Sequence, residues 1–367
     1  MPSNRTVTTS QHGADRLDVL VVIVSYKTAS LTVQAIRSLE TEIPSPGIRI
    51  RVAVVDNDSG DYCEIAEAIE RNSWSSWVTL VKAPRNGGFG YGNNLGIRSG
   101  YGVSAPDYIY LLNPDAQVRP GAVSILVKFL QENPRAGIAG SRIGNSDGSD
   151  WSIAFRFPGM LSEFESGLEV GVVSRLLRGY SVARRMGPAP QRTDWICGAS
   201  MMIRPAVIAK IGGFDESYFL YFEETDFCFR AKQAGFETWY VPGSQVVHIR
   251  GHSTKVTDLS LGPRRLPEYW FDSRRRFFVR TYGVWHAMAI DAAALVGCSL
   301  GLLKRKIVGR GNPGIPCFIR DLLRNSVLLP RNRTVAPLRT FLPQTWTTDR
   351  GQAIAVGDCS PRMESQP

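Results

Sequence analysis

Apolar runs with few charges alternate with stretches of helical spacing in the first part of the chain. The apolar runs are Leu17–Tyr26, Ile48–Val55, Trp77–Val81, Tyr108–Leu112 and Ala136–Ile143. Such runs are typical of strands that are buried on both faces of a parallel sheet. Apolar residues at helical spacing predict helices at Ser30–Leu39, roughly Asp61–Arg71 and Gly121–Asn133. This alternation predicts βαβ units and a doubly wound, mostly parallel α/β sheet.

The pattern becomes less regular after the fifth run. We expect residues 151–193, in which arginines interrupt apolar residues, to form a mobile or acceptor-facing excursion. Regular structure is then predicted again. The expected elements are an apolar run at Trp195–Ile203, a short helix from Pro205, a helix from near Glu224 to Gly235, and a strand at Phe236–Val241.

The C-terminal part has a different composition. Arginines lie among aromatic residues at 264–280, and the apolar segment Trp285–Leu303 is followed by a basic triplet at 304–306. About 20 apolar residues can cross a bilayer, but Asp291 near the middle would be costly in hydrocarbon. A helix that lies in the membrane interface fits better. The alternative is a core helix packed on the main domain.

The net charge of the whole chain favours anionic partners. The chain has 367 residues and a formal charge of +10, which favours nucleic acid, an acidic membrane surface or a phosphorylated substrate. Six cysteines occur without a C-x-x-C pair, which argues against zinc and a disulfide framework and fits a reducing cytoplasm. The N-terminus is polar and lacks the apolar core of a signal peptide.

Two aspartates follow predicted strands. Asp115 comes directly after Asn113-Pro114 at the end of Tyr108–Leu112, and Asp56 ends the second strand. Ligands of open α/β sheets collect beyond the carboxyl ends of the strands. There, Asp115 could hold Mg²⁺ or Mn²⁺ against a diphosphate, and Asp56 could accept a base N–H or a ribose hydroxyl. The alternatives are a helix cap for Asp115 and a turn-forming role for Asp56.

A loop with four glycines, RNGGFGYG at Arg85–Gly92, precedes a predicted helix. It fails the dinucleotide fingerprint because Leu95 stands where the third glycine belongs, and a G-x-x-x-x-G-K-[ST] loop is absent. These patterns argue against a nicotinamide-dependent enzyme and a P-loop ATPase. The alternative for the loop is a flexible turn.

Three carboxylates crowd the start of a predicted helix, at Glu223, Glu224 and Asp226. The helix dipole favours them there, so capping is one interpretation. The aromatic residues around them would also desolvate a carboxylate and raise its pKa, as a general base needs. His248 follows after one further strand, in an expected glycine-containing turn, from which its imidazole could return to the site as a metal ligand.

A resemblance to a known family rests on a series of motifs between Val19 and Arg280. They are VVIVSY, VVDNDS, RNGGFGYGNN, LLNPDA, GASMMIR, GGFDESYFLYFEETDFCFRAKQAG and VVHIRGHS, with SRRRFF further on. In this order and spacing they resemble the inverting family 2 glycosyltransferases, and within them the bacterial rhamnosyltransferase-like branch. The resemblance implies a GT-A fold, a Rossmann-like doubly wound sheet, with a C-terminal helical, membrane-associating extension.

The resemblance also implies roles for single residues. The family's D-x-D motif appears as Asn113-Pro114-Asp115, which leaves only Asp115 to hold the metal, and its later E-D motif appears as Glu223-Glu224. Glu224 is then the catalytic base, and His248 the second metal ligand. The implied donor-binding residues are Asp56, Asn86, Gly87, Gly88, Asn94 and Asn113. The implied acceptor-side residues are Glu223, Asp226 and Gly198.

Four parts of the chain follow from these patterns. They are a disordered leader (1–16), a GT-A domain (17–260), a basic and aromatic helical extension (261–330) and a flexible tail (331–367). Within the domain, about 17–143 is expected to bind the nucleotide, and about 144–260 the acceptor.

The implied reaction is a single displacement with inversion, assisted by Mg²⁺ or Mn²⁺. The expected donor is dTDP-L-rhamnose, with a UDP-sugar as the alternative. The expected acceptor is a polyprenyl-diphosphate-linked sugar or a growing surface glycan, reached from the inner face of the cytoplasmic membrane by a cytoplasmic, peripheral enzyme. Nucleic acid is not an expected partner.

Two other classes stay open at this point. A nucleotidyltransferase would share the sheet and the metal, but its usual glycine-rich, lysine-bearing loop after the first strand is missing. A non-catalytic module that binds membrane or nucleic acid would explain the basic, aromatic tail, but would not need Asp115 or the acidic cluster.

Overall fold

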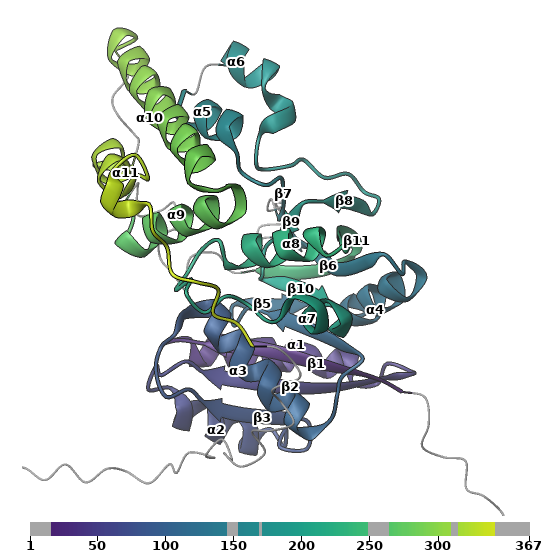
Figure 1. Ribbon diagram of the computed structural model, residues 1–367. Helices are drawn as coiled ribbons and strands as arrows, with labels where there is room; N and C mark the ends of the chain where they lie inside the picture. Colours follow the sequence, from purple (N-terminus) through teal and green to yellow (C-terminus); the bar gives the residue numbers. More distant parts are fainter. Residues whose placement is uncertain (1–15, 145–152, 169–170, 249–263, 310–314, 342–367) are drawn as a thin grey trace, which may run out of the picture.

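The computed structural model describes residues 16–144, 153–168, 171–248, 264–309 and 315–341, and its centre is a nine-stranded sheet (Figure 1). The strand order is β3-β2-β1-β4-β10-β6-β11-β5, and β8 pairs with β11 beside this path. The strands are β1 Leu17–Ser25, β2 Ile48–Asp56, β3 Val78–Lys82, β4 Tyr108–Leu112, β5 Ala116–Val118, β6 Ala136–Gly144, β8 Gln191–Thr193, β10 Ser200–Ile203 and β11 Glu237–His248.

The N-terminal half has the predicted βαβ arrangement. Strands β3, β2, β1 and β4 are parallel neighbours, joined through helices α1 (Ala29–Leu39), α2 (Tyr62–Arg71) and α3 (Gly88–Val103). The last paired residues of β1 and β2 are Ser25 and Asp56, so these two strands end level. The predicted mixed α/β fold is therefore confirmed, and Asp56 lies at the carboxyl edge of the sheet.

Glycines allow α3 to pack closely on β1. A Cβ added to Gly92, Gly96 or Gly100, which follow one another at i, i+4 and i+8, would lie 2.3–2.6 Å from a side chain of β1. These β1 side chains are Val24, Val22 and Leu20. Real Cβ atoms do not approach other atoms so closely, and interiors are close-packed. Part of the glycine-rich pattern therefore serves the contact between helix and sheet.

The C-terminal half of the sheet is mixed. Strand β10 runs antiparallel between β4 and β6, and β11 is parallel to β6, with a register shift between Val241 and Gln245. The predicted strand at Phe236–Val241 is thus the first part of a longer strand that continues past this bulge to His248. The short strand β5 pairs antiparallel with β11, and the sequence analysis did not anticipate it.

Helices α4 (Ala122–Glu132), α7 (Pro205–Ile211) and α8 (Glu223–Gln233) belong to the same half. The region expected to form a mobile or acceptor-facing excursion contains regular structure. It holds β7 (Ala154–Phe155), which pairs with β9 (Trp195–Ile196), and the elements α5 (Met160–Leu168), α6 (Gly171–Leu176) and η2 (Arg178–Tyr180). Helix α5 packs along α10, which removes the reason to treat it as mobile.

The C-terminal extension is helical, as predicted. It contains α9 (Glu268–Tyr282), α10 (Val284–Ile307), α11 (Phe318–Asn325) and the short helix η4 (Pro330–Asn332). Figure 1 shows α9, α10 and α11 gathered beyond the sheet, with α5 beside α10. Asp291 of α10 is buried and accepts hydrogen bonds from Arg274 of α9, from the Ser326 hydroxyl and from the Val327 N–H.

Residues 331–341, predicted to begin a flexible tail, run back along the main domain. The N–H of Gly213 donates to Phe341 O and that of Glu216 to Arg339 O. The ordered chain therefore extends further than expected. The predicted leader up to residue 15, the boundary near 260 and the tail beyond 341 lie outside the described residues.

Candidate active site

The carboxyl end of β2 forms one wall of the site. Asp56 is 1% exposed, and its Oδ1 accepts the N–H and the hydroxyl of Ser59. The next residue, Asn57, donates from Nδ2 to Asn86 Oδ1 at 3.0 Å and to Gly88 O at 3.2 Å. The N–H of Gly87 donates to Asn57 Oδ1 at 3.4 Å. Asn57 thereby fixes the predicted donor loop beside Asp56.

Gly88 has to be glycine at the start of α3. Its φ is +86°, and an added Cβ would lie on the carbonyl oxygen of Phe219. A left-handed backbone and a close backbone approach each favour glycine, and here both apply. The loop thus contacts both Asn57 at the end of β2 and Phe219 in the segment that precedes α8.

Asp115 and His248 meet, although 133 positions separate them in the chain. His248 Nε2 lies 3.0 Å from Asp115 Oδ1, and their side chains are 6% and 0% exposed. Asn113 Nδ2 lies 3.4 Å from the same imidazole nitrogen. The cause is the β5–β11 pairing, which sets His248 opposite Ala116. His248 is therefore the last residue of a strand, where the sequence analysis expected a glycine-containing turn.

Among the described residues, no group of three or more His, Cys, Asp and Glu side chains is placed to hold a metal ion. Asp115 and His248 supply one oxygen and one nitrogen donor. Mg²⁺ in proteins is commonly held by one or two carboxylates together with substrate phosphates. This pair is therefore incomplete as a protein-only metal site and suited to an ion shared with a phosphorylated ligand.

The acidic cluster opens α8 after two residues with left-handed backbone. Tyr221 and Phe222 have φ values of +68° and +67°, and such residues cost about 1–3 kcal/mol each unless their surroundings fix them. Their rings are held by α9: Tyr221 stacks with Tyr269 at 6.2 Å, and Phe222 contacts Phe277 at 5.6 Å between centroids. This backbone turn sets the direction in which α8 begins.

Glu223 and Glu224 differ in environment. Glu223 is 2% exposed, and its Oε2 has no hydrogen-bond partner among the described residues. Burial, followed by the negative charge of Glu224, raises the pKa of Glu223 well above its usual range. Burial also raises the pKa of Glu224, but backbone N–H groups, including that of Gly198 at 3.4 Å, oppose the rise. Burial thus favours a proton on this pair of carboxyls, while the Gly198 N–H favours the charged form of Glu224.

Cys197 shows that the acidic groups share one electrostatic environment. Burial raises the pKa of its thiol to about 12, and the charges of Glu224, Asp115 and Glu223 add to the rise. The thiol thus lies within reach of the acidic pair of α8 and of the Asp115–His248 contact. A proton acceptor, a two-residue cation site and a wall that ends in Asp56 together can support transfer from a phosphorylated donor.

The family model for glycosyl transferase family 2 matches residues 20–207, slightly more than half of the chain. The chain belongs to glycosyl transferase family 2. The predicted resemblance is confirmed, and the protein is a glycosyltransferase, so neither the nucleotidyltransferase nor the non-catalytic module describes it.

Two characterised relatives carry rhamnosyltransferase names. The N-acetylglucosaminyl-diphospho-decaprenol L-rhamnosyltransferase of Mycobacterium tuberculosis is 29% identical over 251 residues, which cover 65% of this chain and 78% of that protein. Rhamnosyltransferase WbbL of Escherichia coli K12 is 27% identical over 174 residues, covering 46% of this chain and 63% of that protein. These matches support the predicted rhamnosyltransferase-like branch.

A solved structure supports the fold. The crystal structure of GalNAc-T7 with UDP, GalNAc and Mn²⁺ superimposes with a TM-score of 0.53 at 15% identity, covering 84% of this chain and 58% of that one. At this identity the likeness concerns the GT-A fold alone.

In this family 2 transferase, two predicted site residues have structural partners. The Asn94 amide donates to Phe214 O and Glu216 Oε1 and accepts the Phe214 N–H, so it fixes the turn before α8. Asp226 is paired with Arg230 at 2.7 Å. Their predicted contacts with donor and acceptor stay predictions, and the structure adds a scaffolding role for both.

The sequence analysis overlooked several residues of the family 2 site. Asn57 was treated as part of a turn, although an amide that follows a strand-end aspartate could have indicated a loop anchor. The Phe89 ring occupies the space beside Gly198, 2.7 Å from where a Cβ would lie. No sequence pattern marks Phe89 or Cys197, because both owe their position to tertiary packing.

The raised pKa of Glu223 predicts a pH-dependent stability. In the unfolded chain this carboxyl ionises near its usual 4.5, whereas the fold favours its protonated form, so stability is lost as pH rises above 4.5. Glu223→Gln cannot ionise, and its thermal unfolding midpoint should exceed that of the parent increasingly from pH 5 to pH 8. Each unit by which the fold raises the pKa corresponds to about 1.4 kcal/mol. The exposed Glu64→Gln of α2 serves as the control, and an equal pH trend in both variants would contradict the assignment.

Proposed function

We propose that this family 2 enzyme transfers L-rhamnose from dTDP-L-rhamnose to a polyprenyl-diphosphate-linked acceptor at the inner face of the cytoplasmic membrane. The donor and acceptor classes are supported by the names of the two relatives, one of which includes a diphospho-decaprenol acceptor. The observation that carries the proposal is the meeting of Asp115 with His248 in the same buried environment as Glu224.

The residues present fit a divalent cation that is shared with the donor. Asp115 and His248 would hold it, since carboxylate oxygen suits Mg²⁺ and Mn²⁺ and imidazole is a common metal ligand. When bound, the cation would neutralise negative charge that develops on the diphosphate leaving group. The burial of both side chains would limit competition from water for this position.

Glu224 takes the proton of the acceptor hydroxyl as that oxygen attacks the anomeric carbon of the donor sugar. Three features support this role: its position at the start of α8, its raised pKa and the Gly198 N–H that orients its carboxylate. Burial favours a proton on Glu223, which would keep a second negative charge away from the base. Asp56, at the level end of β1 and β2, would receive the nucleobase.

Helix α10 supports the membrane part of the proposal. It is long and apolar enough to cross a bilayer, yet only 33% of its most apolar stretch is buried. Its exposed apolar side chains repeat at helical spacing, at Trp285, Val296, Leu300, Leu303 and Ile307. The opposite face packs on the protein and carries the buried Asp291. An exposed stripe that ends at the basic triplet 304–306 suits a helix lying on an acidic membrane surface.

Asp115→Asn should remove cation-dependent donor binding while leaving the fold intact, because one carboxylate does the work of a full D-x-D motif. The measurement is calorimetric titration with dTDP and with UDP, in the presence of Mn²⁺ and of a chelator. The nucleotide affinity of the variant in Mn²⁺ should equal that of the parent in chelator. A variant that retains the full Mn²⁺ effect would exclude Asp115 as a ligand of the cation.

Glu224→Gln should lower turnover by roughly 10²–10⁴-fold with little change in donor affinity, the range expected when a general base is lost. Turnover is measured as sugar transferred from dTDP-L-rhamnose, or from a panel of UDP-sugars, to N-acetylglucosaminyl diphosphate on a short prenyl chain. Glu223→Gln is the matched control and should retain much more activity. Near-parental transfer by Glu224→Gln would make Asp226 the next candidate.

Membrane attachment should be peripheral. High salt or carbonate should release the protein from membranes, because ions screen the attraction of basic residues to acidic lipids. Leu303→Glu should reduce sedimentation with vesicles of acidic phospholipid. Val103→Glu, at a position on α3 that is also well exposed, is the control. Resistance to carbonate would mean that α10 spans the bilayer.

A further inference from the structure

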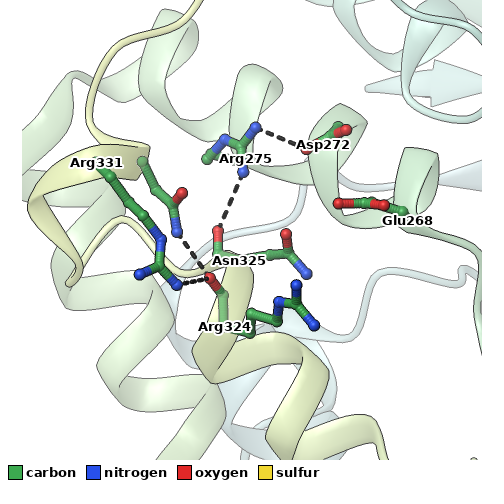
Figure 2. A pocket seen from close by; sticks show the side chains of 7 residues that line it. Glu268, Asp272, Arg275, Arg324, Asn325 and Arg331 are labelled. Carbon is green, nitrogen blue, oxygen red and sulfur yellow. Dashed lines mark hydrogen bonds and ion pairs between the residues drawn. The ribbon is translucent and has the colours of Figure 1, made fainter.

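An open cavity of about 400 Å³ lies in the C-terminal helical extension, between α9, α11 and η4 (Figure 2). Its lining is polar throughout, and it includes none of the residues assigned above to catalysis or donor binding. The charged and amide side chains that matter here are Glu268, Asp272, Arg275, Arg324, Arg331 and Asn332. Three guanidinium groups face two carboxylates, which leaves the cavity with a positive balance.

The arginines differ in how far they are engaged. Arg275 is held by Asp272 at 2.6 Å and reaches the backbone oxygen of Asn325 at 3.5 Å. Arg331 donates to the backbone oxygen of Arg324 at 3.4 Å. The guanidinium of Arg324 itself makes no hydrogen bond or ion pair with the described part of the chain. Arg324 therefore has its donors available for a ligand.

A second cavity of about 320 Å³ adjoins the first. The two share Glu268, Arg324 and Asn325, and the second adds Leu266, the buried Phe271 and the ion pair of Arg265 with Asp321. Together they form a groove that is lined mostly by charged and amide side chains. Guanidinium groups bind phosphate oxygens in pairs of parallel hydrogen bonds, and the carboxylates can accept sugar hydroxyls. A diphosphate that carries a sugar offers both phosphate oxygens and hydroxyls.

The position of the groove suits the acceptor. Glu268 in the cavity precedes Tyr269, which stacks with Tyr221 directly before α8 and Glu224. On the other side, α11 packs against α10, whose exposed apolar stripe is the membrane-facing surface described above. The groove thus lies between the helix start that carries the base and the helix assigned to the membrane.

We propose that this groove binds the diphosphate of the lipid-linked acceptor, with the arginine side chains on the phosphates. The inference rests on the proposed function, since it assumes a diphosphate-linked acceptor. It assigns to the C-terminal extension a direct part in recognising the substrate.

The test compares two variants of the full-length protein with equal loss of charge. One carries Arg324→Gln with Arg331→Gln, and the other carries Arg280→Gln with Arg320→Gln, which are exposed arginines of α9 and α11 outside the groove. The probes are N-acetylglucosaminyl diphosphate on a short prenyl chain, the same sugar on that chain without the diphosphate, and inorganic pyrophosphate. Binding is measured by calorimetry, and acceptor KM by transfer.

The groove variant should weaken binding of the diphosphate-linked probe and raise the acceptor KM by about 10-fold or more, as expected when charge-assisted hydrogen bonds are lost. The control variant should resemble the parent, and the probe without diphosphate should bind weakly to all three. Donor binding should be unchanged throughout. If the groove variant unfolds, Arg324→Gln alone replaces it, because this guanidinium holds no other described residue.

Three results would overturn the inference. Equal effects in both variants would reduce the groove to general surface charge. Binding of pyrophosphate that the diphosphate-linked probe does not displace would assign the groove to free phosphate. Unchanged affinity for the diphosphate-linked probe in the groove variant would place the acceptor elsewhere. Failure of the parent to transfer any sugar, despite arginine-dependent binding of the probe, would count against the proposed function and leave the groove assignment standing.

Discussion

The site depends on the hydrogen bonds that the buried carboxylate of Asp215 accepts. Asp215 is 0% exposed, and it accepts hydrogen bonds from Arg276 of α9 and from the N–H groups of Ser217 and Arg339. Three parts of the chain thus meet on one side chain: the turn before α8, helix α9 and the returning segment 336–341. Removing one partner of such a buried pair leaves an uncompensated charge and costs about 3–5 kcal/mol. The turn it holds leads to Tyr221, Phe222 and the start of α8 with Glu223 and Glu224.

Strain in this turn makes the surrounding contacts necessary. Two consecutive left-handed residues, Tyr221 and Phe222, would relax if their rings were free. The aromatic residues that hold these rings belong to α9, the helix that also supplies Arg276. The C-terminal extension therefore helps to fix the backbone that leads to Glu224. The family model ends at residue 207, before all of these contacts.

The sequence located residues correctly where a single strand determines their position. Strand ends located Asp56 and Asp115, because mainly apolar runs followed by turn residues mark the carboxyl edge of a parallel sheet. The sequence was less informative where two distant elements meet. Strand β5 has three residues, too few for a periodic signal, yet its pairing with β11 brings His248 to Asp115. The glycines of α3 illustrate a second limit. Close packing on β1 and a ligand-binding loop both require glycine, so the sequence does not distinguish them.

Asp291 shows how a tertiary contact changes the meaning of a residue. In the sequence it argues against a membrane span, because an isolated carboxylate is costly in hydrocarbon. In the structure it binds Arg274, which also binds Glu163 of α5, so one buried network joins α5, α9 and α10. Helix α10 is thereby fixed relative to α9, and α9 is fixed relative to the turn before Glu224. The apolar stripe of α10 then has one orientation with respect to the base, so contact with a membrane through that stripe would set the direction from which a lipid-linked acceptor approaches.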